Sequence, residues 1–114
     1  MNTAILTKQE RNTLLHAFAP YARHIDRVGI FGSRATGKAG PASDIDIVLY
    51  GDLDVQSERR LWTMLDETEL PVAVDLVVYS RIKNALLKSH IDAVCVELFT
   101  RRDLLRANAA AAKT

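Results

Sequence analysis

The chain has 114 residues, 48% of them hydrophobic, which is enough apolar material to bury the core of one domain. Its 15 basic and 14 acidic residues nearly balance, and this argues against a dedicated polynucleotide binder, because such proteins usually carry a basic excess. No apolar run approaches the roughly 18 residues of a membrane span, and no signal-peptide pattern opens the chain. We therefore expect a cytoplasmic protein with no membrane partner and no direct nucleic-acid partner.

The N-terminal part predicts a helix followed by a strand. Thr7 and Glu10 have the spacing of a capping box, and apolar residues then recur at helical spacing. These signals predict a helix over residues 8–22, with Pro20 able to stop or kink it near its end. The apolar run after it predicts a strand over residues 27–31.

The stretch that organises the chain lies between this strand and the next one. Gly32 and Ser33 end the first apolar run, and a short helix is expected over residues 33–38. Glycine lets the backbone approach a ligand closely, and free amides at the start of a helix favour phosphate, to which Ser33 adds a hydroxyl group. These residues predict a phosphate-binding turn.

The strand expected over residues 44–50 carries two acids, Asp44 and Asp46, among Ile, Val and Leu. Residues i and i+2 of a strand share a face, roughly 6.5 Å apart along it. A buried carboxylate is costly unless it is paired or binds metal. Together with the phosphate-binding turn, the two acids predict a site of metal-dependent phosphoryl or nucleotidyl transfer.

The remaining chain predicts further alternation of helix and strand. Helices are expected over residues 55–70 and 81–90, strands over 72–79 and 94–100, and an alanine-rich, fraying tail over 101–114. The order is typical of an α/β protein with a small central sheet, in which ligands gather at one end of the sheet. The lone Cys95 lies in an apolar run and is expected to be buried and inert.

A third acid, Asp75, is the only charge in its strand. It either faces solvent at a sheet edge or joins Asp44 and Asp46, since two-metal sites usually share three or more acids. Arg34 and Lys38 are the bases nearest the phosphate-binding turn. Each is either a solvated charge or a partner for the leaving pyrophosphate of a triphosphate donor.

Gly32-Ser33, ten intervening residues and then Asp44-Ile45-Asp46 resemble the signature of the minimal nucleotidyltransferases, a branch of the DNA polymerase beta superfamily. The resemblance covers about residues 25–100 of a chain that reads as one domain over residues 1–114. It implies a nucleotidyltransferase fold of the α+β kind, with a small mixed sheet flanked by helices and the acids on its exposed face. It places Asp75 as the third carboxylate.

What the resemblance implies about function is specific. ATP would be the donor, held with two Mg²⁺ ions by Asp44, Asp46 and Asp75, with Gly32 and Ser33 on its phosphates. Members of this family are commonly antitoxins that transfer AMP to a tyrosine of a partner, a HEPN ribonuclease toxin. Two alternatives stay open: an antitoxin that only covers its toxin sterically, and a small-molecule nucleotidyltransferase that works with a helical subunit.

Overall fold

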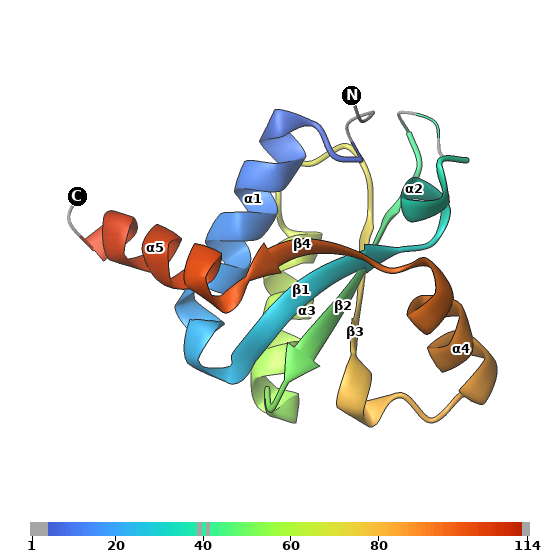
Figure 1. The fold of residues 1–114 in the computed structure, drawn as a ribbon. Helices are drawn as coiled ribbons and strands as arrows, with labels where there is room; N and C mark the ends of the chain where they lie inside the picture. The colour runs from blue at the N-terminus through green and yellow to red at the C-terminus, as the bar shows by residue number, and fades with distance from the viewer. Residues whose placement is uncertain (1–4, 39, 41, 113–114) are drawn as a thin grey trace.

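The computed structural model describes residues 5–38, 40 and 42–112, and its strands form one four-stranded mixed sheet (Figure 1). The strands are β1 (Ile25–Phe31), β2 (Ile45–Gly51), β3 (Val74–Val78) and β4 (Val96–Thr100), in the spatial order β3-β2-β1-β4. β1 pairs antiparallel with both β2 and β4, whereas β2 and β3 run parallel. This confirms the expected small mixed sheet.

Helices alternate with the strands as the sequence predicted. They are α1 (Lys8–Phe18), α2 (Ser33–Thr36), α3 (Val55–Asp66), α4 (Ala85–Val94) and α5 (Arg101–Ala112). Two 3₁₀ helices, η1 (Ala19–His24) and η2 (Tyr79–Arg81), join the larger elements. No helix among the described residues is long and apolar enough to cross a membrane.

Helix boundaries differ from the sequence expectation where local caps act. The predicted helix 8–22 changes to a 3₁₀ helix after Phe18, because Pro20 lacks the N–H that an α-helix needs there. The helix predicted over 81–90 begins instead at Ala85, since the side chain of Asn84 caps it by accepting from the amides of Leu86 and Leu87.

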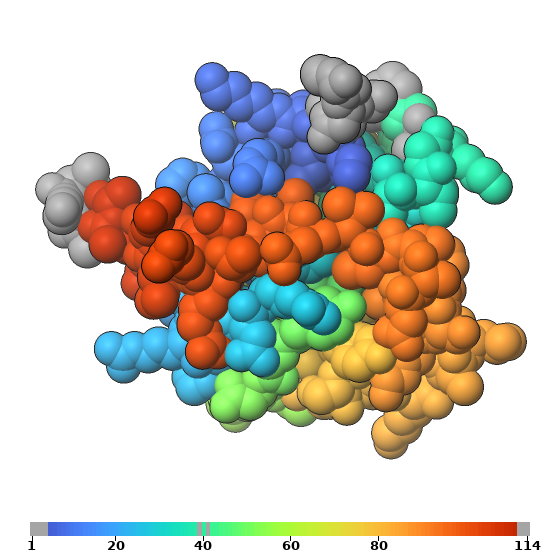
Figure 2. All heavy atoms as spheres, viewed as in Figure 1, coloured from blue at the N-terminus to red at the C-terminus, as the bar shows by residue number. Residues whose placement is uncertain are grey.

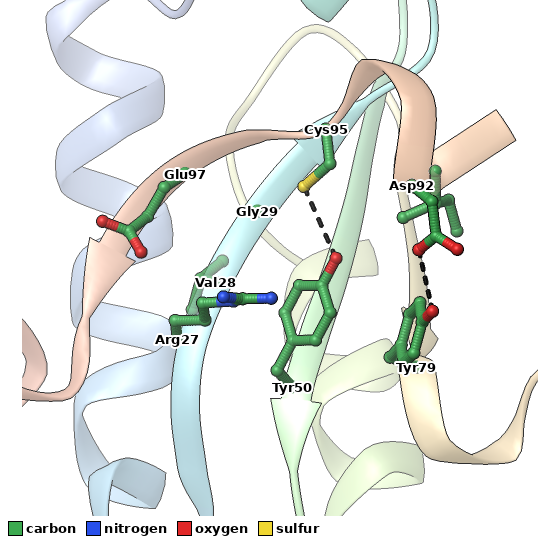
Figure 3. A pocket seen from close by; sticks show the side chains of 9 residues that line it. Arg27, Val28, Gly29, Tyr50, Tyr79, Asp92, Cys95 and Glu97 are labelled. Carbon is green, nitrogen blue, oxygen red and sulfur yellow. Dashed lines mark hydrogen bonds between the residues drawn. The ribbon is translucent and has the colours of Figure 1, made fainter. Parts of the chain in front are cut away.

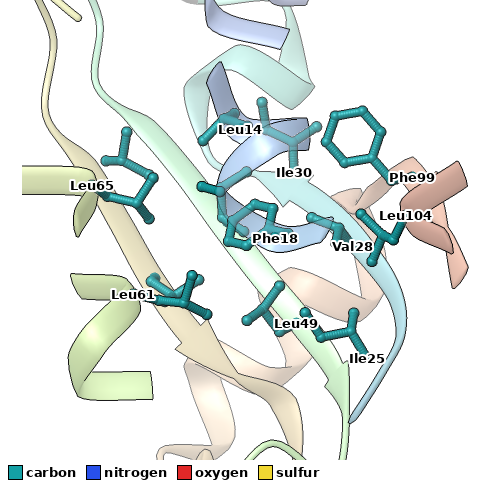
Figure 4. Packing of buried hydrophobic residues seen from close by; sticks show 14 of the residues in the cluster. Leu14, Phe18, Ile25, Val28, Ile30, Leu49, Leu61, Leu65, Phe99 and Leu104 are labelled. Carbon is teal, nitrogen blue, oxygen red and sulfur yellow. The ribbon is translucent and has the colours of Figure 1, made fainter. Parts of the chain in front are cut away.

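The two faces of the sheet differ in what covers them. Alternate residues of β1, β2 and β3 face a main core that also contains residues of α1, α3 and α5 (Figure 4). The opposite face is partly covered by α4, whose Ile91 packs against Phe31 and Val48 in a smaller cluster. Asp46 and Asp75 lie at positions that alternate with the main-core residues, so the acids belong to this second face.

Candidate active site

Asp46 and Asp75 are neighbours because their strands pair in parallel. The two residues are register partners across β2 and β3. Asp46 is half-buried, whereas Asp75 is exposed. The structure thus brings together two of the predicted acids through a strand pairing that links distant parts of the chain.

Asp44 lies just before β2, at the same end of the strand pair. It is exposed, and its Oδ1 accepts a hydrogen bond from the Ala73 amide at 3.3 Å. Ala73 directly precedes β3, so this bond fixes Asp44 beside the strand that carries Asp75. Within the described part of the chain, no three His, Cys, Asp or Glu side chains already converge as a set able to hold a metal ion.

The carboxylates of Asp44 and Asp75 surround Asp46 with negative charge. Burial raises the pKa of Asp46 above its usual range, and the charges of Asp75 and Asp44 raise it further, while His90 opposes them. A half-buried carboxyl group beside two other carboxylates favours either a proton or a cation, and we call Asp44, Asp46 and Asp75 together the acid cluster. The acid cluster is therefore suited to divalent metal in its charge and its oxygen ligands.

Gly32 lies directly against the acid cluster. Its φ is +74°, and a β-carbon built there would stand 2.1 Å from Oδ2 of Asp46. Only glycine fits without moving Asp46, so the close approach that the sequence suggested involves a side chain of the site itself. Ser33 follows as the exposed first residue of α2.

The two predicted basic residues have different surroundings. The guanidinium group of Arg34 is buried and makes five hydrogen bonds, to Glu10 and to the carbonyl groups of Ser43 and Ile5. Arg34 has five N–H groups in all, so none is left for a phosphate in this arrangement. Lys38, by contrast, is exposed at the end of the turn after α2.

His90 is a site residue that sequence reasoning missed. It comes from α4, and its ring meets Phe31 edge-on, with 6.2 Å between ring centroids. It is close enough to Asp46 to lower the pKa of that carboxyl group. The sequence suggested no partner for His90, and the packing of α4 on the sheet brings it close to Asp46.

A pocket of about 380 Å³ lies further along the same face (Figure 3). The Arg27 guanidinium lies 3.9 Å above the Tyr50 ring, which stacks on Tyr79 with 4.9 Å between centroids. In Figure 2, atoms of β1 (cyan) reach the surface here, beside the orange and green atoms of later elements. Val48 lies between Asp46 and Tyr50 on β2 and packs in an apolar cluster, which separates this pocket from the acids.

Cys95 was expected to be buried, and it is a half-buried free cysteine that lines this pocket. The Tyr50 hydroxyl group donates to its Sγ at 3.7 Å. Burial, followed by the contact with Cys95, raises the pKa of Tyr50 to about 12. Tyr50 is therefore uncharged at physiological pH and packs in this pocket as a neutral ring.

Comparison with known proteins agrees with the fold and the motif. The nucleotidyltransferase domain family matches residues 13–102, and the chain belongs to that family. A crystal structure of a toxin–antitoxin with AMP-PNP is similar over 90% of this chain and 86% of its own, with 19% identity and a TM-score of 0.64. A structure of the toxin–antitoxin MntA-HepT is similar over 94% and 85%, with 18% identity and a TM-score of 0.54.

At these identities the structural likenesses establish the fold alone. They confirm the nucleotidyltransferase fold that the Gly-Ser and Asp-x-Asp pattern implied. No curated protein shows significant sequence similarity to the chain.

Proposed function

We propose that the chain is a Mg²⁺-dependent nucleotidyltransferase that acts as an antitoxin, transferring AMP from ATP to a tyrosine of a HEPN-type ribonuclease toxin. The observation that carries the proposal is the pairing of Asp46 with Asp75 beside Gly32 and Ser33. Support comes from the nucleotidyltransferase family match and from structural neighbours described as toxin–antitoxin complexes, one of them with AMP-PNP.

In this proposal the exposed turn and the acids hold different parts of the donor. Gly32, Ser33 and the exposed Lys38 contact its phosphate tail. Asp44, Asp46 and Asp75 would hold two Mg²⁺ ions, for which their oxygen atoms and crowded charge are suited. When bound, Mg²⁺ neutralises charge on the phosphate groups and lowers the barrier to their transfer.

The proposed transfer forms one bond to phosphorus and breaks one. The tyrosine oxygen of the acceptor forms a bond to the α-phosphorus of ATP, and the bond from that phosphorus to the bridging oxygen breaks. Pyrophosphate leaves with the electron pair. We assign the removal of the phenolic proton to Asp75, because it is the exposed member of the strand-paired acids.

A protein acceptor fits the surface of this chain better than a polynucleotide does. The formal net charge is only +1, so no large basic surface is expected to hold a nucleic-acid backbone. Asp44 and Asp75 are exposed, so the side chain of a docked protein can reach them from solvent.

The test is the mass and activity of the partner. We expect the toxin co-expressed with this chain to carry added AMP on a tyrosine and to stay inactive as a ribonuclease after separation. A bulky anion beside an RNA site repels phosphate and blocks access. The Asp46→Asn variant should leave the partner unmodified, while Arg102→Lys, an exposed change on α5, should not affect modification.

Each alternative has its own outcome in the same experiment. An unmodified toxin that regains activity on separation would overturn the transferase proposal in favour of steric neutralisation. An unmodified protein together with an adenylylated small molecule would indicate a small-molecule transferase.

A further inference from the structure

Arg34 follows Ser33 directly, yet its side chain is buried between α1 and the loop that leads to Asp44. The side chains of Arg34 and Glu10 are 6% and 4% exposed. Their contact is a two-pronged ion pair, with Nη1 of Arg34 2.6 Å from Oε1 of Glu10 and Nη2 3.1 Å from Oε2. A buried pair with this geometry holds two elements in one relative position.

The same guanidinium group donates hydrogen bonds to the peptide group that precedes Asp44. Nε and Nη2 of Arg34 donate to the carbonyl oxygen of Ser43 at 3.1 and 2.7 Å. That carbonyl group belongs to the peptide link between Ser43 and Asp44. Two donors on one oxygen fix the plane of this peptide and hence the direction in which the chain enters β2.

Asp44 is held from its other side by the strand next to it. Its Oδ1 accepts from the Ala73 amide, and the Ile45 amide donates to the Ala73 carbonyl group at 2.9 Å. Arg34 thus holds the residue before Asp44, and Ala73 holds the Asp44 side chain and the residue after it. Two hydrogen bonds between Gly40 and Ser43 also order the chain before Asp44.

Glu10 connects this arrangement to the N-terminal helix. Its Oε1 also accepts from the Thr7 amide at 2.9 Å, so one carboxylate caps α1 and binds Arg34. Both Glu10 oxygens and every Arg34 N–H group are occupied in the pair and its surroundings.

We propose that Arg34 and Glu10 are positioning residues that hold Asp44 in place for catalysis, acting through the Ser43 carbonyl group. The catalytic part of this inference rests on the proposed function. The positioning part concerns the ligand-free protein, so it can be tested separately. A residue that only contacted donor phosphate would leave the ligand-free loop unchanged, and this difference decides between the two roles.

The first experiment measures amide hydrogen exchange in the ligand-free protein. Arg34→Lys keeps the charge but loses the fork that reaches Glu10 and Ser43 together. We expect exchange at the Ser43, Ile45 and Ala73 amides to rise about ten- to a hundredfold, as a lost network of charged hydrogen bonds implies. Exchange at Val28 and Ile30, in the main core, should change far less.

Two further variants keep this experiment decisive. Glu10→Gln should raise exchange at the same amides by a smaller factor, because the glutamine oxygen still accepts a hydrogen bond. If Arg34→Lys does not fold, the result for Glu10→Gln tests the positioning role. Arg102→Lys, the same exchange of residue types at an exposed position, should change nothing. Unchanged exchange at Ser43, Ile45 and Ala73, or an equal rise in the main core, would overturn the positioning role.

The second experiment compares kcat and KM for ATP in AMP transfer. Misplacing Asp44 should lower kcat at least about tenfold in Arg34→Lys, because small displacements of catalytic groups are costly. KM for ATP should change less. A raised KM with unchanged ligand-free exchange would assign Arg34 to phosphate binding instead. If the wild-type chain transfers nothing, the proposed function fails, and the exchange experiment still decides whether Arg34 positions Asp44.

Discussion

At the scale of single residues, Gly32 meets two demands at once. Its φ of +74° favours glycine, and the carboxylate of Asp46 occupies the space where a β-carbon would stand. Gly37 has a similar φ of +79°, yet a β-carbon there would meet no atom of the described residues within 4 Å. The two glycines therefore separate the cost of backbone conformation from the cost of displacing an active-site acid.

We expect Gly37→Ala to destabilise the protein by about 1 kcal/mol and Gly32→Ala by on the order of 3 kcal/mol, because only the second adds a clash. Urea unfolding of both variants measures the difference. In an Asp46→Ala background the extra cost at Gly32 should shrink, since the clashing oxygen is gone. Equal costs in the wild-type background would contradict the proposed contact.

The sequence was enough to identify the three acids of the site, but not the residues from other elements that surround them. Asp44 and Asp46 are visible because strand alternation puts them on one face, and Asp75 because it interrupts an apolar strand. The role of Arg34 depends on Glu10, a residue of another element whose capping function gave no sign of a second partner. Nor could any local pattern show that α4 brings His90 close to Asp46.

At the scale of elements, tertiary packing stabilises α5, a helix that the alanine-rich composition of the tail alone did not establish. Alanine favours helix, and the helix extends from Arg101 to Ala112; fraying at its end stays a prediction. Leu104 is fully buried in the main core, and Nε of Arg101 donates to the carbonyl groups of Ala22 and Ile25. These contacts with distant residues stabilise the helix, and no local propensity encodes them.

The adjacent leucines of α5 provide a matched test. Leu104→Ala should destabilise the protein by about 2–5 kcal/mol, because it leaves a cavity in the core. Leu105 is 46% exposed, so Leu105→Ala should change stability by less than about 0.5 kcal/mol. Thermal and denaturant unfolding measure both. Similar small effects for the two would mean that α5 is not docked on the core as described.

At the scale of the whole molecule, two carboxylates have opposite effects on stability. Burial alone would raise the pKa of Glu10, but the hydrogen bonds from Arg34 and Thr7 and the Arg34 charge lower it below its ordinary 4.5. Ionised Glu10 therefore stabilises the fold above that pH, and this contribution is lost as the pH falls through its folded pKa. Asp46 has a pKa raised above its ordinary 3.8, so the fold loses stability as the pH rises from about 3.8 to that raised pKa, and the full penalty is present above it.

The same chemical change at these two residues should thus move the melting temperature in opposite directions. At pH 7 we expect Asp46→Asn to raise Tm by a few degrees while abolishing transfer, and Glu10→Gln to lower Tm by on the order of 5–15 °C. Both variants change the net charge equally, so each controls for the other. Calorimetry from pH 7 down to pH 3 should show both differences from wild type shrinking as the carboxyl groups protonate. A shift of the same sign in both variants would attribute the effect to net charge and refute the local account of the acid cluster.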